Sequence, residues 1–254
     1  MKILRFHTPQ RGPRLGWLYE DRVGEIDGNP FDAYRRLDPD IPIESIKLLP
    51  PALPGKVICV GRNYRAHADE HGVEVGEIPV LFLKPPTSLT GPGDPIVLPP
   101  QSKQVQHEAE LAVVIGKAGR RIQPEDAMDY VFGYTIANDV TARDLQRADI
   151  TWTRGKGFDT FCPLGPWIET EFDPADALIT CHVSQELRQM ASTRDMVFSI
   201  HRLIAFISSV MTLEPGDVIL TGTPAGVGDL VDGDIVSITI EGLGTLTNPV
   251  IDET

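Results

Sequence analysis

The chain has 254 residues, of which 41% are hydrophobic and 23% are charged, a composition usual for a globular protein with a buried core. Its formal net charge of −13 at pH 7 argues against nucleic acid or an anionic membrane surface as the main partner. The three cysteines are widely spaced and form no CxxC motif, which favours a reducing compartment without disulfides. No apolar segment follows the charged N-terminus, and the most apolar helical segment, near 203–211, is too short to cross a bilayer, so we expect a cytoplasmic protein.

The first 50 residues predict a small β-rich domain. Short strands are expected at 2–6 and 14–19, because the stretch between them has the Pro and Gly content of a hairpin connection. A Pro-Pro pair and linker-like composition place a boundary near residue 50. We therefore predict an N-terminal domain of residues 1–50 and a main domain of residues 51–254.

A polar segment after the next predicted strand carries a histidine and a glutamate at helical spacing. Residues 62–72 can form about two helical turns before a glycine. His67 and Glu70 are three residues apart, so on a helix they share a face and could form a general base with its orienting carboxylate. Taken alone, the spacing favours the other interpretation, a histidine on a solvated helix surface.

Two glutamates and an aspartate stand at the ends of two predicted core strands. Glu108 and Glu110 are two residues apart at the start of the apolar run 111–115, so their side chains project from the same face of a strand. Asp139 follows a second apolar run, 131–137. Three carboxylates without Cys or His ligand spacing suit a hard cation, Mg²⁺ or Mn²⁺, rather than zinc. The spacing is equally compatible with glutamates on the wet face of an antiparallel strand.

The residues after Asp139 predict a helix. Thr141 is placed to cap it, with Asp144 three residues later, as in a near capping box. We expect this helix to carry Arg143, Gln146 and Arg147 away from the strand end. The next polar stretch, 153–159, predicts a loop.

Three further segments bear on the site. Lys156 stands between two glycines in a predicted loop, 153–159, where the backbone can approach a ligand closely. Apolar residues at helical spacing predict one helix that starts at Ser192 or Thr193 and continues to Met211. The glycine-rich run 221–228 lacks the amphipathic helix of a dinucleotide fingerprint, and we expect a tight loop that brings backbone N–H groups to an anion.

Six segments, in order and in register, resemble the fumarylacetoacetate hydrolase superfamily from about residue 55 to the C-terminus. They are GRNYRAHADE at 61–70, LFLKPPTSLTG at 81–91, HEAELAVVIGK at 107–117, GYTIANDVTARDLQ at 133–146, GKGFDTFCPLGPW at 155–167 and GDVILTGTPAGVG at 216–228. This resemblance implies an α+β, predominantly β fold, a mixed β-sandwich roll with few peripheral helices and an active site between its layers.

By this resemblance the metal ligands are Glu108, Glu110 and Asp139, the same carboxylates that the strand spacing singles out. The hydrolytic pair falls on His67 and Glu70, on a segment that behaves as a mobile lid in relatives, and we expect residues 62–78 to be more mobile without ligand than the strands around them. The resemblance further implies that Lys156 is an active-site lysine. It also implies four substrate-binding residues, namely Arg62, Lys84, Gln146 and Thr223.

The resemblance implies an enzyme that binds Mg²⁺ or Mn²⁺ and acts on a small 2-oxo acid through a metal-bound enolate. Two outcomes break a C–C bond: hydrolysis of an acylpyruvate, with His67 activating water, or decarboxylation of an oxaloacetate-type diacid. The alternative is an isomerase or decarboxylase of hydroxymuconate-type diacids, such as 2-hydroxyhepta-2,4-diene-1,7-dioate, in aromatic catabolism. A non-catalytic, metal-bound β module would leave His67, Glu70 and Lys156 without a role. We expect a homodimer.

Overall fold

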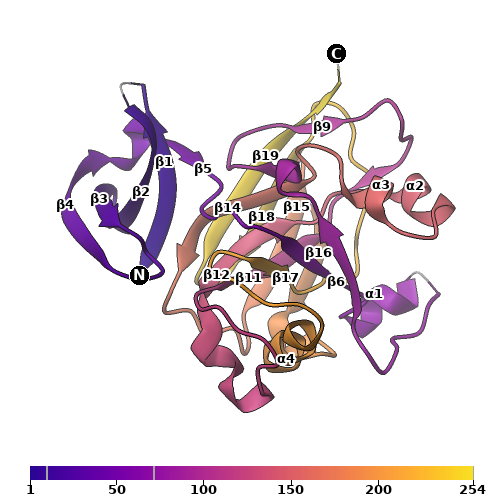
Figure 1. The fold of residues 1–254 in the computed structure, drawn as a ribbon. Helices are drawn as coiled ribbons and strands as arrows, with labels where there is room; N and C mark the ends of the chain where they lie inside the picture. The colour runs from indigo at the N-terminus through magenta and orange to yellow at the C-terminus, as the bar shows by residue number, and fades with distance from the viewer. Residues whose placement is uncertain (10, 71, 254) are drawn as a thin grey trace.

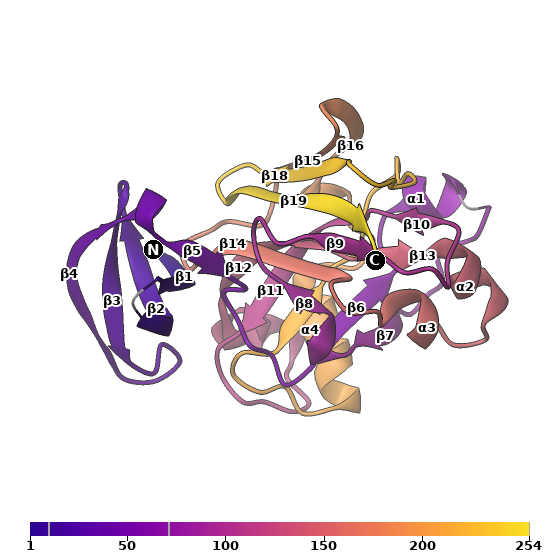
Figure 2. The ribbon, with the colours of Figure 1, turned by 90° about the horizontal axis from the view of Figure 1, so that it is seen from above.

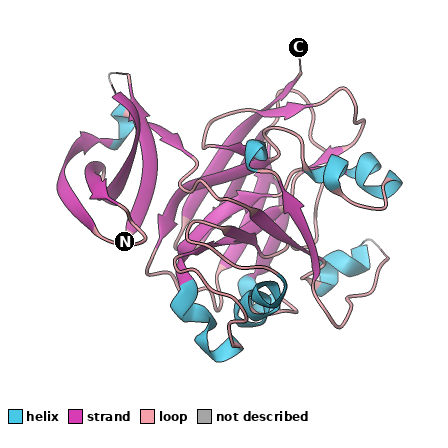
Figure 3. Ribbon diagram, in the orientation of Figure 1, coloured by secondary structure: helices cyan, strands magenta, loops and turns pink. Residues whose placement is uncertain are grey.

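The computed structural model describes residues 1–9, 11–70 and 72–253, which form mostly β-strand with a few short helices (Figures 1 and 3). The helices lie at the outside of the layered strands, as the colours of Figure 3 show. The predicted fold class, α+β and predominantly β with peripheral helices, is therefore confirmed.

The N-terminal strands form an antiparallel meander to one side of the rest of the chain (Figures 1 and 2). Its elements are β1 Lys2–Thr8, β2 Arg11–Tyr19, β3 Arg22–Gly28, β4 Tyr34–Pro42, the 3-10 helix η1 Ile43–Ser45 and β5 Lys47–Leu49. The two expected strands lie within β1 and β2, but the sequence pattern misses β3 and β4, because charged residues and glycine interrupt their apolar alternation. In β1, Lys2 also pairs with Glu169, so the meander continues the central sheet. The division of the chain at residue 50 stays a prediction.

The central sheet continues in the order β1-β14-β12-β11-β17-β6-β7. Its other strands are β6 Val57–Gly61, β7 Val80–Lys84, β8 Leu89–Thr90, which pairs with β14, β11 Ala109–Ile115, β12 Val131–Asn138, β14 Cys162–Glu169 and β17 Val218–Leu220. Every residue of β11 is buried, because Leu111 and Val113 face one core cluster while Ala112 and Val114 face another. Burial on both faces explains why this strand reads as a continuous apolar run.

A second sheet covers one face of the first and has the order β16-β15-β18-β19-β9. Its strands are β9 Ile96–Leu98, β15 Leu178–Val183, β16 Glu186–Ser192, β18 Ile235–Ile240 and β19 Gly244–Asp252; a separate pair joins β10 Val105–Gln106 to β13 Thr141–Ala142. Figure 2 shows β18 and β19 layered over β14 and β12. Leu111, Ile179 and Ile238 meet in the core between the sheets.

The helices are short and lie at the edges of the sheets. They are α1 Arg65–Glu70, η2 Pro86–Ser88, η3 Pro124–Tyr130, α2 Arg143–Ala148, α3 Thr153–Lys156, η4 Thr193–Asp195 and α4 Ile200–Val210. Within the described ranges, no helix is long and apolar enough to cross a membrane.

The expectation of one continuous helix over 192–211 is wrong, because the segment divides into η4 and α4. The N–H groups of Val197 and Phe198 donate to the backbone oxygen and to Oδ1 of Asn63, at 2.8 and 2.7 Å. A continuous helix would use these donors internally. The chain therefore stays extended until Ser199 caps α4.

Candidate active site

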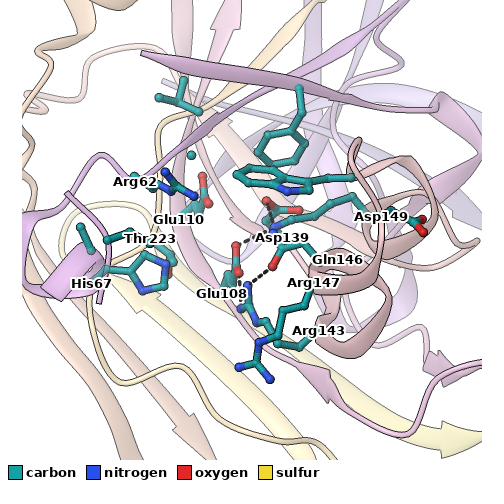
Figure 4. A pocket seen from close by; sticks show the side chains of 17 residues that line it. Arg62, His67, Glu108, Glu110, Asp139, Arg143, Gln146, Arg147, Asp149 and Thr223 are labelled. Atoms are coloured by element: carbon teal, nitrogen blue, oxygen red, sulfur yellow. Dashed lines mark hydrogen bonds and ion pairs between the residues drawn. The ribbon is translucent and has the colours of Figure 1, made fainter. Parts of the chain in front are cut away.

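A cavity of about 350 Å³ is lined by side chains from α1, α2 and α3, among other segments (Figure 4). Most of the predicted site residues line it, namely Arg62, His67, Glu108, Glu110, Asp139, Gln146, Lys156 and Thr223. Two predicted residues, Glu70 and Lys84, are absent from the described residues that line the cavity.

The three carboxylates that the strand pattern singles out lie together. In the sheet, Ala109 on β11 pairs with Asn138 on β12, which places Glu108 and Glu110 beside Asp139 at the strand end. One oxygen from each carboxylate falls within 4.8 Å of the others, and all three side chains are buried (Figure 4). The glutamates are therefore not on a solvated strand face.

Two buried lysines neutralise part of this negative charge. The Nζ atom of Lys156 donates to Glu108 Oε2 at 2.8 Å and to Asp139 Oδ2 at 2.6 Å. The Nζ atom of Lys84 donates to Asp139 Oδ1 at 2.6 Å and to the Val140 oxygen at 3.0 Å. Lys84 thus orients a carboxylate from behind the cavity, and its expected contact with substrate is not supported by this geometry.

The environments of the two glutamates push their pKa values in opposite directions. Burial opposes the ionisation of Glu108, but Lys156 and Arg143 outweigh burial and hold its pKa well below the usual range. Burial, followed by repulsion from Asp139 and Glu108, raises the pKa of Glu110 well above the usual range.

Glu110 differs from the other two carboxylates in the groups that contact it. It accepts a hydrogen bond of 2.6 Å from the Gly222 N–H, yet across the described part of the chain no lysine or arginine forms an ion pair with it. A buried carboxylate in this state is costly unless a cation approaches. The three carboxylates therefore fit a divalent cation with oxygen ligands, Mg²⁺ or Mn²⁺.

The expectation that α2 carries Arg143 away from the strand end is wrong, because this side chain points into the cavity. Its guanidinium is buried, forms an ion pair with Glu108, and donates to Gln146 Oε1 at 2.6 Å and to Gln106 Oε1 at 2.7 Å. Thr141 does not cap the helix, because it belongs to β13 and its hydroxyl donates to the Asp139 oxygen at 2.8 Å. Pairing of β13 with β10 delays the helix until Arg143, and this start turns the side chain back into the cavity.

Lys156 lies on a helical turn rather than in the expected loop. The last residue of α3, it has its backbone N–H bonded to the Trp152 oxygen at 3.0 Å. A Cβ atom on Gly155 would lie 2.9 Å from Gln146 Cα, so glycine at this position lets α3 pack directly against α2. This close approach carries the Lys156 ammonium into the carboxylate cluster.

His67 and Glu70 lie side by side on α1, as their spacing predicts. His67 Nδ1 lies 3.5 Å from Glu70 Oε2, and Glu70 accepts the Gly226 N–H at 3.2 Å through both carboxylate oxygens. The imidazole is buried and faces the carboxylates across the cavity (Figure 4). Glu70 therefore stands behind His67, where it can orient the ring, and the reading of His67 as a solvated surface residue is wrong.

The glycine-rich run forms the loop that was expected, and its N–H groups bind carboxylates of the protein itself. Gly222 and Gly226 donate to Glu110 and Glu70, which belong to the two halves of the site. Gly222 has φ +100°, a backbone conformation that suits glycine. Between these glycines, Thr223 lines the cavity and donates its hydroxyl hydrogen to the Ala109 oxygen at 2.9 Å.

Residues 56–251 match the family described as fumarylacetoacetate (FAA) hydrolase C-terminal, and residues 1–51 match the Rv2993c-like N-terminal family. The chain belongs to the fumarylacetoacetate hydrolase family. Nearly all of the residues outside the C-terminal match belong to the N-terminal segment 1–51, which forms the meander.

Among related proteins of the fumarylacetoacetate hydrolase family, the chain is 42% identical over 288 residues to the human mitochondrial oxaloacetate tautomerase FAHD2A, covering 99% of this chain and 92% of that protein. The structure of 5-carboxymethyl-2-hydroxymuconate delta-isomerase from Mycobacterium smegmatis is 46% identical, with a TM-score of 0.93 and coverage of 100% of both chains. Maleylpyruvate hydrolase from Sphingobium sp. SYK-6, solved with manganese(II) ion and pyruvate, is 36% identical, with a TM-score of 0.82 and coverage of 100% of both chains. Members of the family are thus enzymes, including an isomerase, a hydrolase and a tautomerase.

The sequence pattern misses two buried polar residues that hold this fumarylacetoacetate hydrolase site. Arg143 has a detectable signal, since it begins a helix only four residues after the strand-end Asp139. Gln189 gives no such signal, because it lies on β16, a strand of mixed polar and apolar residues that comes next to the site only through the second sheet.

Proposed function

We propose that this protein is a divalent-metal-dependent enzyme that forms the enolate of a 2-oxo acid and breaks a C–C bond, by acylpyruvate-type hydrolysis or oxaloacetate-type decarboxylation. The proposal is carried by one arrangement: a buried carboxylate cluster faces His67, which Glu70 supports from behind, across one cavity. Carboxylates alone would suit a structural ion, and a histidine alone would suit a surface helix. Their convergence favours chemistry on a bound anion.

Glu108, Glu110 and Asp139 would hold Mg²⁺ or Mn²⁺. When bound, the ion supplies Lewis-acid polarisation of the oxygens of a 2-oxo acid. The ammonium of Lys156, whose pKa is raised by Asp139 and Glu108 against the effect of burial, stays protonated beside the reacting oxygens. It can therefore stabilise negative charge as the enolate forms.

Positive side chains on the cavity wall suit a dianionic or monoanionic acid. Arg62 and Arg147 line the cavity together with Arg143 and Gln146. Because Arg143 is already paired with Glu108, Gln146 and the two other arginines are better placed to receive a carboxylate of the substrate. These contacts would select 2-oxo acids despite the net negative charge of the chain.

In the hydrolytic reaction His67 would remove a proton from water, while Glu70 keeps the imidazole oriented. The water would attack the distal carbonyl of an acylpyruvate, and the C–C bond would break with pyruvate enolate as the leaving group. Decarboxylation of an oxaloacetate-type diacid needs no activated water. The position of α1 would therefore decide which reaction proceeds.

A second candidate, isomerisation or tautomerisation, is supported by the likeness to the Mycobacterium smegmatis isomerase and the human tautomerase. In this reaction His67 would move a proton between carbon atoms, or between carbon and oxygen, of the substrate and no C–C bond would break.

The test is incubation of the purified protein with acetylpyruvate, oxaloacetate or a hydroxymuconate-type diacid, each with Mg²⁺, with Mn²⁺ or with a chelator. We expect metal-dependent formation of pyruvate and acetate, or of pyruvate and carbon dioxide. Metal-dependent isomerisation without any cleavage product would favour the second candidate. Equal turnover in the chelator would contradict both.

A further inference from the structure

Gln189 lies at the centre of a buried hydrogen-bond network beneath the cavity. Its side chain is fully buried on β16. The Oε1 atom accepts the Ala109 N–H at 3.0 Å and lies 3.0 Å from His107 Nδ1. The Nε2 atom donates to Thr223 Oγ1 at 2.8 Å and to the Pro224 oxygen at 2.8 Å. A carboxamide has two donor hydrogens and two acceptor sites, and in the tautomer that carries a proton on His107 Nδ1 every hydrogen-bonding position of Gln189 is used.

Three of these groups close a ring. Gln189 accepts from the Ala109 N–H and donates to Thr223 Oγ1, while the Thr223 hydroxyl donates to the Ala109 oxygen. Both backbone polar groups of Ala109 are therefore held from the same side. Ala109 is the residue between Glu108 and Glu110, so the ring fixes the backbone from which these carboxylates project.

We propose that Gln189 is a positioning residue that fixes the metal-binding carboxylates and the Thr223 loop relative to each other. It acts through Ala109 on the spacing of the two glutamates and through Thr223 on the cavity wall. This inference rests on the proposed function, because it concerns the affinity of the site for the ion and for its substrate.

The chemistry of Gln189 sets it apart from core residues that only fill space. An apolar side chain of similar volume would avoid the cost of desolvating an amide. Removing the amide would leave Ala109, His107 and Thr223 with buried groups that have lost a partner. The arrangement is therefore sensitive to side-chain chemistry at the point where the site is built.

Asn248 offers a matched control. It is a buried amide on β19 whose Nδ2 atom donates to the oxygens of Gly91 and Asp94, both at 2.8 Å. Among the described residues that line the cavity, neither Asn248 nor these two partners occurs. Asn248→Leu thus removes buried amide hydrogen bonds of similar length without touching the ring around Ala109.

The experiment compares the wild type, Gln189→Met and Asn248→Leu, first by calorimetric titration of the metal-free proteins with Mn²⁺. Loss of a partner that orients a metal ligand costs roughly 10- to 100-fold in metal affinity, and we expect a loss on the order of tenfold in Gln189→Met. Hydrogen exchange at the Ala109 amide should also accelerate in this variant. Asn248→Leu should lower the melting temperature but keep the dissociation constant for Mn²⁺ and the Ala109 protection.

Steady-state kinetics then separate positioning from a general loss of stability. With Mn²⁺ at saturation, we expect the KM of Gln189→Met for the 2-oxo acid substrate to rise, because Thr223 on the cavity wall would shift. The KM of Asn248→Leu for the same substrate should stay unchanged. Should Gln189→Met fail to fold, the Mn²⁺ titration is carried out with Thr223→Val instead. This variant removes the Thr223 hydroxyl from the same ring, and we expect the same loss of Mn²⁺ affinity. Wild-type protein that binds no Mn²⁺ would overturn the proposed function. Wild-type binding with an equal dissociation constant in the ring variant would overturn only the role of Gln189.

Discussion

The Nζ atom of Lys156 lies 2.6 Å from Asp139 Oδ2 and 2.8 Å from Glu108 Oε2, so one ammonium bridges two of the three clustered carboxylates. Glu110 stands outside this bridge. The cluster is thus divided into a neutralised part and a carboxylate that still needs a cation. This division explains why one site can contain both a lysine and a set of ligands for a divalent ion.

Replacement of Lys156 by methionine should destabilise the metal-free protein. Removing one partner of a buried ion pair costs about 3–5 kcal/mol, and we expect the lower end of that range because Lys84 and Arg143 still face the cluster. Urea unfolding measures the change, with Lys117→Met, an exposed lysine, as the control. Mg²⁺ should restore part of the loss by binding the uncompensated carboxylates. Equal stability of the two variants would contradict this account.

Glu110 should make the stability of the metal-free protein depend on pH. Burial and its two acidic neighbours raise its pKa in the folded state above the ordinary value of 4.5, while the unfolded chain keeps the ordinary value. The folded state therefore binds the proton more tightly, and this contribution is fully present below about pH 4.5. It is lost as the pH rises through the raised pKa of the folded state.

The measurement is urea unfolding across this pH window in the presence of a chelator. Glu110→Gln should lose this pH-dependent component, whereas Glu125→Gln, which changes an exposed glutamate, should retain it. Affinity for Mn²⁺ should change in the opposite sense and increase as Glu110 deprotonates. Identical pH profiles in the wild type and Glu110→Gln would show that this carboxylate does not control the titration.

The strand pattern predicts the carboxylate cluster because alternation and strand ends are local properties of the sequence. Glu108 and Glu110 share a face by spacing alone, and Asp139 follows the next core strand. What the pattern cannot supply is the direction of a side chain that depends on a distant partner. Arg143 turns inward because β13 pairs with β10, and the helix expected over 192–211 is interrupted because its N–H groups bond to Asn63.

The strand β16 shows the same limit for Gln189. Its residues alternate poorly, so neither the strand nor its buried glutamine is predicted. Its pairing with β15 brings Gln189 opposite Cys181 and beneath the Thr223 loop. A contact between residues more than thirty positions apart in sequence follows from the stacking of two sheets, which no local pattern encodes.

Within the predicted lid, residues 62–78, the described residues from 65 onward should exchange their amide hydrogens faster than β11 in the ligand-free protein. Its start is anchored, since the Nδ2 atom of Asn63 donates to the oxygens of Phe198 and Thr221 at 3.1 and 2.8 Å. Beyond α1 the described residues are mostly exposed and outside regular structure. Residue 71, within the predicted lid 62–78, lies outside the described residues. Hydrogen exchange with mass spectrometry measures the difference, and Mn²⁺ with a 2-oxo acid analogue should slow exchange in the segment. Protection as strong as that of β11 in the free protein would contradict a mobile lid.

The His67–Glu70 pair and the clustered carboxylates should contribute differently to hydrolysis and to decarboxylation. Removing a metal ligand, as in Glu110→Ala, should abolish hydrolysis and decarboxylation alike, because both pass through an enolate. His67→Ala should damage hydrolysis far more, since only hydrolysis needs an activated water. General-base catalysis contributes roughly 10²–10⁴-fold, so acylpyruvate cleavage should fall on the order of a hundredfold or more.

Glu70→Ala should reduce hydrolysis in the same direction, because Glu70 holds His67 through a contact of 3.5 Å and is itself held by Gly226. Both variants are assayed with acetylpyruvate and oxaloacetate at saturating Mg²⁺, with His201→Ala on the exposed face of α4 as the control. We expect the control to match the wild type and oxaloacetate decarboxylation to fall much less than acetylpyruvate hydrolysis. Equal losses for the two substrates would mean that His67 and Glu70 position the substrate or α1, and the assignment of a water-activating base would be wrong.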